Sequence, residues 1–341
     1  MKRVSIVGGS GFVGGELARW LLDHEGVELA QMTSERLAGQ PVERVHPHLR
    51  GRRRLRFVAS SDLEPCDVLI AALPHGQAAG RAEQFAGLAP FLIDCSADHR
   101  LMDPADHLRW YGEERGGVEG FAYGLPEVNR EALRGAQKAS GVGCNATAVQ
   151  LALLPLERAG LLPRGRSIVA NVLGGSSEGG ASSSPGSHHP VRAGSLRSYA
   201  PVGHRHTAEV LQTFAGLELA MSVTATERVR GAHATCHVQL AEPTTERELL
   251  GIWRNAVRDE PFLDVLHERA GAYRAPDPKL VTGTNRAQLG FALDASGERV
   301  VALAAIDNLG KGAAGSAVQS MNLMLGLPEA QGLDFHGLHP L

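Results

Sequence analysis

The feature that most constrains the fold lies at the N-terminus, where a short apolar strand runs into a glycine-rich turn. Residues 4–7 are typical of a buried strand, the turn follows as Gly8-Gly-Ser-Gly11-Phe-Val-Gly14, and a helix is expected over 16–22. Strand, glycine turn and helix in this order are the context of a dinucleotide-binding fingerprint. The GxxGxxG spacing lets the backbone and a helix N-terminus approach a pyrophosphate. We therefore expect the cofactor to be bound by Gly8, Ser10, Gly11, Phe12, Val13 and Gly14.

The second strand, over 27–32, bears on the choice of cofactor because it ends in Thr33-Ser34-Glu35-Arg36. An NAD enzyme is expected to place an acid here for the ribose 2′-hydroxyl. Hydroxyl groups and an arginine instead suit the 2′-phosphate of NADP, since a guanidinium pairs with phosphate in a fork. Glu35 is a small counter-argument, and a loop with a solvated arginine is the alternative. We predict NADP(H), with Ser34, Glu35 and Arg36 at the site.

Length and patterning indicate two domains. The chain has 341 residues, of which 43% are hydrophobic and 21% charged, an ordinary composition for a globular protein of roughly two domains. Strands alternate with helices in the first part of the chain, and β-rich segments follow. We expect an α/β fold with a Rossmann-type parallel sheet over 1–143, completed by a C-terminal helix within 308–341. Residues 144–307 are expected to form an α+β domain with a mixed, largely antiparallel sheet.

Charge and cysteine usage exclude several classes of protein. The net charge of −3 gives no reason to expect nucleic acid or an anionic membrane as a partner. No run reaches about 18 apolar residues and the N-terminus enters a strand directly, so we expect a cytoplasmic protein. The four cysteines form no CxxC pair, and no metal site is expected. Cys66, Cys95 and Cys236 lie in or beside strand-like runs and are interpreted as core thiols.

Cys144 is the cysteine with a chemical context. It follows a glycine pair and precedes an apolar run over 149–156 that favours a helix, which Pro155 is expected to kink or end. A thiol at a helix N-terminus tends to have a lowered pKa, and the thiolate is the nucleophile. A small buried cysteine beside a tight turn is the alternative.

Several further segments lie between and after the expected strands. Residues 174–190 form a Gly/Ser-rich stretch that we interpret as a lid over the site. Helices are expected over 246–258 and 262–269, and a final helix over 316–325. The basic run 50–56 is interpreted as a solvated loop or edge strand, with a docking patch as the alternative. Arg100 is a candidate phosphate ligand, although a structural pair with Asp98 is an equal alternative.

A second polar cluster, Gly203-His204-Arg205-His206-Thr207-Ala-Glu209, offers acid–base chemistry. An imidazole holds or releases a proton near neutral pH, and beside a thiolate it forms an ion-pair nucleophile. Glu209 could orient one ring if a helix begins here. A pair of surface histidines is the alternative. A dinucleotide domain, a thiol and an imidazole together suggest attack on an acyl group, loss of phosphate and hydride reduction of the thioester.

The motifs together resemble the N-acetyl-γ-glutamyl-phosphate reductase family, relatives of aspartate-semialdehyde dehydrogenase. The resemblance runs nearly end to end and rests on the glycine turn, the segments at 33–36, 46–51, 96–100 and 123–127, Gly143-Cys144, 203–207 and 307–315. It implies that Cys144 accepts the acyl group, that His204 is the acid/base and that Asn308 contacts the nicotinamide. Arg100, Arg205, His206 and Glu209 are the candidate substrate-binding residues.

Within that family the chain resembles the lysine-pathway branch. Arginine-pathway enzymes typically carry Tyr directly after the catalytic cysteine, whereas Asn145 and Ala146 stand here, and His99 replaces a usual Phe. The resemblance implies NADPH-dependent reduction of an aminoadipyl phosphate carried on a small acidic protein, LysW. Arg192, Arg197 and 52–56 are candidate contacts for that carrier, and a homo-oligomer (dimer or tetramer) is expected. The alternatives are an arginine-pathway N-acetylglutamyl-phosphate reductase, one enzyme for both pathways, and a non-catalytic NADP-binding protein.

Overall fold

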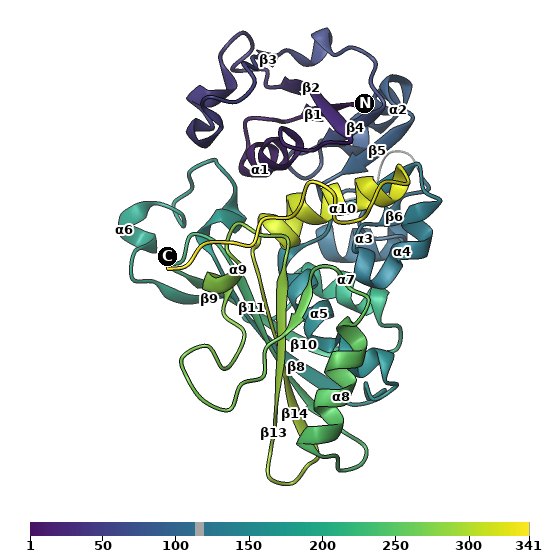
Figure 1. Cartoon of the computed structure of the whole chain (residues 1–341), viewed down its shortest axis with the longest axis vertical. Helices are drawn as coiled ribbons and strands as arrows, with labels where there is room; N and C mark the ends of the chain where they lie inside the picture. Colours follow the sequence, from purple (N-terminus) through teal and green to yellow (C-terminus); the bar gives the residue numbers. More distant parts are fainter. Residues whose placement is uncertain (113–118, 341) are drawn as a thin grey trace. The chain divides into compact units, whose positions relative to one another are not determined.

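The structure is a computed structural model that describes residues 1–112 and 119–340. Residues 113–118 and 341, which fall within the expected domain ranges, lie outside the described part. The chain forms two compact units, drawn in Figure 1 with the sequence running from purple to yellow. One unit comprises Met1–Val142 and Ala313–Asp334, and the other comprises Gly143–Gly312 and Phe335–Leu341.

This division differs from the expected ranges near the C-terminus. Residues 308–312 and 335–341 group with the second unit rather than the first. The side chain of Asn308 is anchored there, because its amide donates to Ser177 Oγ at 2.8 Å and accepts from Gly231 N at 2.7 Å. The Tyr273 hydroxyl likewise lies 2.8 Å from His339 Nε2.

The first unit is built on a seven-stranded sheet in the order β3-β2-β1-β4-β5-β7-β6, with every pair of neighbours parallel. The expected Rossmann-type parallel sheet is therefore confirmed. Strand β4 is buried along its whole length, as expected where helices cover both faces of a parallel sheet. The strands are β1 (Lys2–Val7), β2 (Val27–Thr33), β3 (Phe57–Val58), β4 (Val68–Ala71), β5 (Phe91–Asp94), β6 (Ala122–Tyr123) and β7 (Lys138–Ser140).

The helices of this unit include the last long helix of the chain. α10 packs against α1 and α4, so a segment near the C-terminus completes the N-terminal unit. The helices are α1 (Phe12–Leu21), α2 (Ala82–Leu88), α3 (Pro104–Tyr111), α4 (Pro126–Arg134) and α10 (Gly315–Met324), with short 3-10 turns η1 (Val42–Arg44), η2 (Pro47–Leu49), η3 (Ser60–Asp62) and η4 (Ala79–Arg81).

The second unit holds another seven-stranded sheet, in the order β12-β13-β14-β11-β8-β10-β9. The pairs β12–β13 and β8–β10 are parallel and the other pairs are antiparallel, which confirms the mixed, largely antiparallel sheet. The strands are β8 (Ser167–Gly174), β9 (Leu196–Ala200), β10 (Glu218–Thr226), β11 (Ala232–Gln239), β12 (Leu263–Val265), β13 (Ala287–Leu293) and β14 (Arg299–Ile306).

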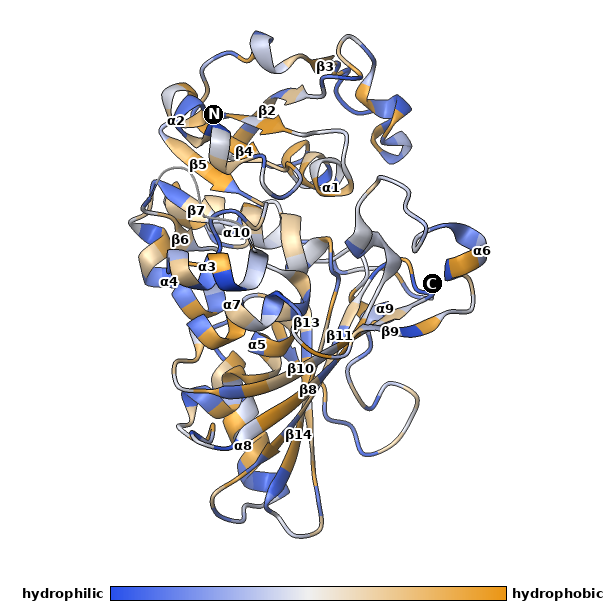
Figure 2. Cartoon of the chain, turned by 180° about the vertical axis from the view of Figure 1, so that it is seen from behind, coloured by the Kyte–Doolittle hydropathy of each residue, from blue (hydrophilic) through white to orange (hydrophobic). Residues whose placement is uncertain are grey.

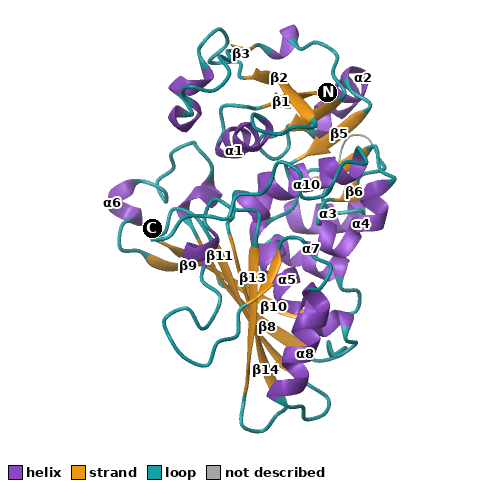
Figure 3. Ribbon diagram, viewed as in Figure 1, coloured by secondary structure: helices purple, strands orange, loops and turns teal. Residues whose placement is uncertain are grey.

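Helices cover one face of this sheet. Figure 3 shows α5 (Cys144–Arg158), α7 (His206–Thr213) and α8 (Glu246–Val257) on the same side of the strands. α5 is buried from Asn145 to Leu156, and β8 alternates buried and exposed residues, as a strand does when one face is covered. Apolar residues, orange in Figure 2, run along β8 and β14. On the uncovered face Val169 and Leu173 are exposed.

One local expectation was wrong. Residues 262–269 were expected to be helical but contain β12, because Leu263 and its neighbours pair with β13. Of the two outcomes expected at Pro155, a kink or a helix end, the end is not found: α5 continues to Arg158, and Ala159 N donates to Pro155 O in the next turn. The stretch 174–190 contains η5 (Ser176–Gly179) and enters α6 (His189–Arg192), and its role as a lid remains a prediction.

Candidate active site

The glycine turn of the first unit has the backbone that a phosphate site requires. Gly8 adopts φ 81°, and a Cβ there would lie 2.4 Å from Ala72 O. A Cβ on Gly14 would lie 2.7 Å from Gly9 Cα, so only glycine permits this approach of helix to turn. Helix α1 begins at Phe12 with Gly11 as N-cap and no side-chain cap, which leaves N–H donors of its first turn for a ligand.

The end of β2 lies against this turn. The Thr33 hydroxyl accepts from Gly8 N at 3.2 Å, and the Ser34 hydroxyl donates to Ser10 Oγ at 3.1 Å. Glu35 faces η3, where its Oε1 accepts from Ser60 N at 3.0 Å, and hydrogen bonds from Ser60 lower the pKa of this carboxyl. Arg36 is exposed, and within the described residues it forms no hydrogen bond or ion pair. An exposed guanidinium therefore lies two residues after Ser34, while Glu35 is engaged elsewhere.

His46 supports the same turn, a role that the sequence did not indicate. Its Nε2 lies 2.8 Å from Gly9 O, and its ring fills the space beside Gly15, where a Cβ would lie 2.4 Å from His46 Nδ1. Burial lowers the pKa of this imidazole. The neutral Nε2–H can then donate to the Gly9 carbonyl, which fixes the second residue of the glycine turn.

The polar residues after β5 are buried in the first unit. The Asp98 carboxylate accepts from Gly76 N at 2.7 Å and from Ala78 N and Ala79 N at 3.0 Å, so it holds the turn after β4. Arg100 is buried and donates to Cys95 O at 3.2 Å. His99, which replaces the usual Phe, stacks on Phe121.

Cys144 is the first residue of α5, and the N-cap Gly143 provides no side-chain cap. Glu209 Oε2 accepts from Gly143 N at 2.8 Å. A Cβ on Gly143 would lie 2.7 Å from His206 Nε2, and one on Gly312 would lie 2.7 Å from Cys144 Cβ. The absence of a side chain at Gly143 therefore leaves space for the His206 ring, and its absence at Gly312 leaves space for Cys144 itself.

The two histidines have different surroundings. His206 lies against Gly143, with its Nε2 4.0 Å from Glu209 Oε1. His204 Nε2 lies 3.3 Å from the Tyr199 hydroxyl, and the two imidazole rings meet edge to face at 4.6 Å. Burial, followed by the charge of Arg205, lowers the pKa of His204 to about 4. His204 is therefore neutral at pH 7. His206 lies beside Gly143, the residue that precedes Cys144.

Glu178 is a site residue that the sequence analysis missed. Its Oε2 accepts from Asn145 Nδ2 at 3.1 Å, and the Cys144 thiol lies within hydrogen-bonding reach of the same carboxylate. Burial raises the pKa of Glu178 to about 7. The only signal in the sequence was one acid within a stretch of glycines and serines. Asn145, noted for its difference from the arginine-pathway pattern, is the residue that holds it.

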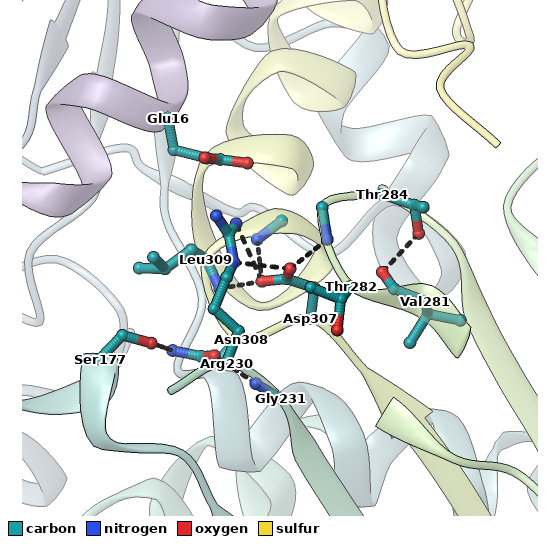
Figure 4. Close-up of polar contacts among 12 residues, drawn as sticks. Glu16, Ser177, Arg230, Gly231, Val281, Thr282, Thr284, Asp307, Asn308 and Leu309 are labelled. Carbon is teal, nitrogen blue, oxygen red and sulfur yellow. Dashed lines mark hydrogen bonds and ion pairs between the residues drawn. The ribbon is translucent and has the colours of Figure 1, made fainter. Parts of the chain in front are cut away.

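An ion pair between the partly exposed Arg230 and the buried carboxylate of Asp307 secures the segment after β14, as Figure 4 shows. Arg230 donates to Asp307 through Nε at 2.8 Å and Nη2 at 3.2 Å, and Asp307 Oδ1 also accepts from Leu309 N at 2.8 Å and Gly310 N at 3.0 Å. Next to it, Asn308 joins Ser177 to Gly231. Asn308 thus holds η5, which carries Glu178. Its expected contact with nicotinamide remains a prediction.

Within the described part of the chain, no group of His, Cys, Asp and Glu side chains is arranged to hold a metal ion. None of the helices in the described residues is long and apolar enough to cross a membrane.

Comparison with protein families identifies two adjoining domains. Residues 3–136 match the semialdehyde dehydrogenase NAD binding domain, and residues 144–308 match the semialdehyde dehydrogenase dimerisation domain. Together these ranges cover well over half of the chain.

The similar curated proteins align over nearly their full length. A Deinococcus radiodurans protein named a LysW-linked L-2-aminoadipate 6-phosphate reductase is 46% identical, covering 99% of this chain and 98% of its own. A Thermomicrobium roseum protein with a corresponding name is 47% identical over 99% of both chains. A Haloarcula marismortui relative, 47% identical over 99% and 98%, is named for both LysW-linked 2-aminoadipate and LysW-linked glutamate phosphates.

Solved structures support the fold. An aspartate semialdehyde dehydrogenase II from Vibrio cholerae matches with a TM-score of 0.74 at 16% identity, covering 96% of this chain and 98% of the other. An aspartate semialdehyde dehydrogenase with NADP from Candida albicans matches with a TM-score of 0.67 at 15% identity, covering 95% and 98%.

Proposed function

The chain belongs to the semialdehyde dehydrogenase family and is an oxidoreductase of the aldehyde-forming type, and on that premise we propose that it reduces a LysW-linked 2-aminoadipyl 6-phosphate with NADPH. The products are the semialdehyde and phosphate. The observation that carries the proposal is Cys144 at the uncapped N-terminus of α5, beside a carboxylate and an imidazole. A thiol so placed turns an acyl phosphate into a thioester, which a hydride reduces to an aldehyde.

In the proposed reaction, several residues of the second unit take part in the chemical steps. Cys144 attacks the acyl carbon and phosphate leaves. His204 is proposed as the acid/base of the hydride step: neutral at pH 7 because its pKa is about 4, it donates an N–H hydrogen bond to the oxyanion that forms as hydride adds to the thioester. Arg205, His206 and Glu209 are proposed to orient the substrate, and Glu209 holds the N–H of Gly143 at 2.8 Å. Arg100 of the first unit is proposed as a ligand of the phosphoryl group.

The proposed cofactor is NADP(H), which when bound supplies the hydride. Its pyrophosphate suits the glycines of the turn 8–14, together with the uncapped N–H groups of α1. Ser34 and Arg36 suit the 2′-phosphate, since the Glu35 carboxylate accepts from Ser60 N instead. We also propose that Asn308 contacts the nicotinamide with the amide hydrogen that its bond to Ser177 does not use.

The substrate assignment rests on the relatives named for LysW-linked 2-aminoadipate. The Haloarcula marismortui name favours a second substrate, the LysW-linked glutamyl phosphate. The two acyl chains differ by one methylene, which is worth only about 1–3 kcal/mol of discrimination. A further alternative is N-acetylglutamyl phosphate, the substrate of the arginine-pathway enzymes. A non-catalytic NADP-binding protein would not require Cys144, Glu178 and the imidazoles together.

The proposed partner is the acidic carrier protein. Arg52 and Arg53 already pair with Asp23 at 3.1 Å and Glu28 at 2.6 Å, which leaves them less available. Arg54 and Arg197 are exposed candidates for the carrier. Exposed charge pairs mainly govern association rate and its salt dependence. Raising the salt concentration should therefore lower kcat/KM for the carrier-linked substrate, and a flat salt profile would contradict this docking mode.

We further propose that the protein is a homo-oligomer, with a dimer or tetramer expected. The uncovered face of the second sheet, which exposes Val169 and Leu173, is the candidate interface. The match to a dimerisation domain over 144–308 supports this assignment. Light scattering on the purified protein measures its mass, and a monomeric mass would contradict the proposal.

The reverse reaction provides the most direct test of the activity. The protein is supplied with NADP⁺, phosphate and either LysW-linked 2-aminoadipate semialdehyde or N-acetylglutamate semialdehyde, and NADPH formation is followed by absorbance. We expect turnover with the carrier-linked aldehyde and much less with the acetylated one. Cys144→Ala should abolish turnover and leave NADPH binding unchanged. Turnover by this variant would refute the thioester intermediate. A preference for the acetylated aldehyde would instead indicate the activity of the arginine pathway.

A further inference from the structure

The Glu178 carboxylate occupies a defined position beside the nucleophile. The loop after β8 is tied to the chain before β11, where Ser176 N donates to Arg228 O at 2.7 Å and Ser177 N donates to Val229 O at 3.0 Å. Asn308 holds the Ser177 hydroxyl. A Cβ on Gly174 would lie 2.6 Å from Glu178 Oε1, so glycine at this position leaves the space that the carboxylate fills. The backbone therefore fixes where this acid lies.

The two oxygens of Glu178 have different surroundings. Oε2 accepts from Asn145, whereas Oε1 is buried and, within the described residues, has no hydrogen-bond partner. Oδ1 of Asn145 is likewise buried there without a partner. Leaving a buried polar atom without a partner is unfavourable. These acceptors, next to the Cys144 thiol, are therefore suited to a donor that arrives with the substrate.

The groups around Glu178 suit an anionic ligand and a mobile proton. The positive charge of Arg192 lowers the pKa of the Glu178 carboxyl and so opposes the effect of burial. The Arg192 Nε atom is buried without a hydrogen-bond partner among the described residues. Desolvation, followed by the negative charges of Glu178 and Cys144, raises the pKa of the Tyr199 phenol, which stays protonated. A guanidinium is thus present for a phosphoryl group, and the carboxyl, with a pKa of about 7, can take up or release a proton at neutral pH.

We propose that Glu178 is a catalytic residue that relays the proton of the Cys144 thiol to the departing phosphate. As Sγ bonds to the acyl carbon, its proton passes to the carboxylate of Glu178. As the bond from that carbon to the phosphate oxygen breaks, the same proton passes to the oxygen. The step consumes thiol and acyl phosphate and yields thioester and hydrogen phosphate, with Glu178 again ionised. Without the relay, phosphate would leave as the poorly stabilised trianion.

The inference rests on the proposed function, because it concerns the acylation step of that reaction. It also gives Arg192 a different task from carrier docking, namely holding the phosphoryl group. Asn145 is then a positioning residue, because it acts on the reaction through the carboxylate it holds. Asn145 and Glu178 are adjacent in space, which gives a physical reason why the residue after the nucleophile is polar in this chain.

Two reactions of the same thiol test the relay in Glu178→Gln. The first is acylation, measured as phosphate released in a single turnover at pH 7 with excess protein over LysW-linked 2-aminoadipyl 6-phosphate and without cofactor. The second is alkylation of Cys144 by iodoacetamide, in which the thiol proton goes to solvent before the thiolate attacks and iodide leaves without needing a proton. We expect Glu178→Gln to slow phosphate release by about 10²–10⁴-fold. Alkylation should be no slower than in the unmodified protein.

Each other outcome has a definite meaning. Equal phosphate release in Glu178→Gln and the unmodified protein would overturn the relay, and so would a loss of both reactions, because that would indicate a structural role. Glu227→Gln is the matched control, because Glu227 is a carboxylate of the same unit that accepts from Gly194 N at 2.8 Å, and it should leave both rates unchanged. If the unmodified protein releases no phosphate, the proposed function itself is refuted, and the relay with it.

Discussion

The buried carboxylate of Asp307 allows a quantitative prediction. Its oxygens accept five N–H groups, two from Arg230 and one each from Gly283, Leu309 and Gly310. In Asp307→Asn one oxygen becomes an NH₂ group that faces at least two of these donors in either orientation of the amide. The guanidinium of Arg230 also loses the negative charge of Asp307. Breaking a buried pair in this way costs about 3–5 kcal/mol, a large part of the roughly 5–15 kcal/mol by which a folded protein is stable.

The measurement uses an internal probe of the second unit. Trp253 is fully buried in α8, so its fluorescence in a Trp20→Phe, Trp110→Phe background reports urea unfolding of that unit alone. Glu157→Gln is the matched control in the same unit, since the Glu157–Arg164 pair spans 2.9 Å between side chains that are 32% and 41% exposed. Such a partly exposed pair is worth below about 1 kcal/mol. An Asp307→Asn loss no larger than that of the control would refute the reasoning.

Three further predictions concern the cofactor, the thiols and the histidine. Arg36→Ala should raise the Kd for NADPH far more than that for NADH in a fluorescence titration, and an equal loss would contradict a 2′-phosphate contact. Because burial raises the pKa values of Cys95 and Cys236 to about 12, mass spectrometry should find Cys144 alkylated by iodoacetamide at pH 8 well before either of them; labelling of Cys236 first would contradict this. Because the folded-state pKa of His204 is about 4, below the 6.5 of the unfolded chain, its contribution to stability should be present above pH 6.5 and fall as the pH drops towards 4. His204→Asn should flatten that part of the pH–stability curve, and an unchanged curve would argue against the partly buried, neutral imidazole.

The sequence predicted best what depends on local pattern. The strand, glycine turn and helix at residues 4–22 need neighbours only a few positions apart, and the structure has them with α1 beginning at Phe12. The prediction of a helix over residues 262–269 failed for the opposite reason. Their apolar residues suit a helix or a strand equally, and pairing of Leu263 with Ala287 of β13, far along the chain, decided the outcome.

The candidate site was only partly predictable for a similar reason. Cys144 and the His204–Glu209 cluster were apparent because several reactive residues lie close together in sequence. Glu178 was not, since it stands alone in a Gly/Ser-rich segment and its meaning depends on Asn145, 33 positions earlier. His46 likewise acts on Gly9, 37 positions away. Spacing within a motif cannot reveal partners that only the fold brings together.

The glycines around Cys144 have a consequence for mutational tolerance. Gly143, Gly174 and Gly312 each stand where a Cβ would collide, at 2.4 Å with Glu209, at 2.6 Å with Glu178 and at 2.7 Å with Cys144. None of them has reactive chemistry, yet alanine, the smallest possible replacement, already intrudes on the thiol or on a group beside it. A saturation scan of the gene should therefore find these positions nearly as depleted of functional variants as Cys144 itself.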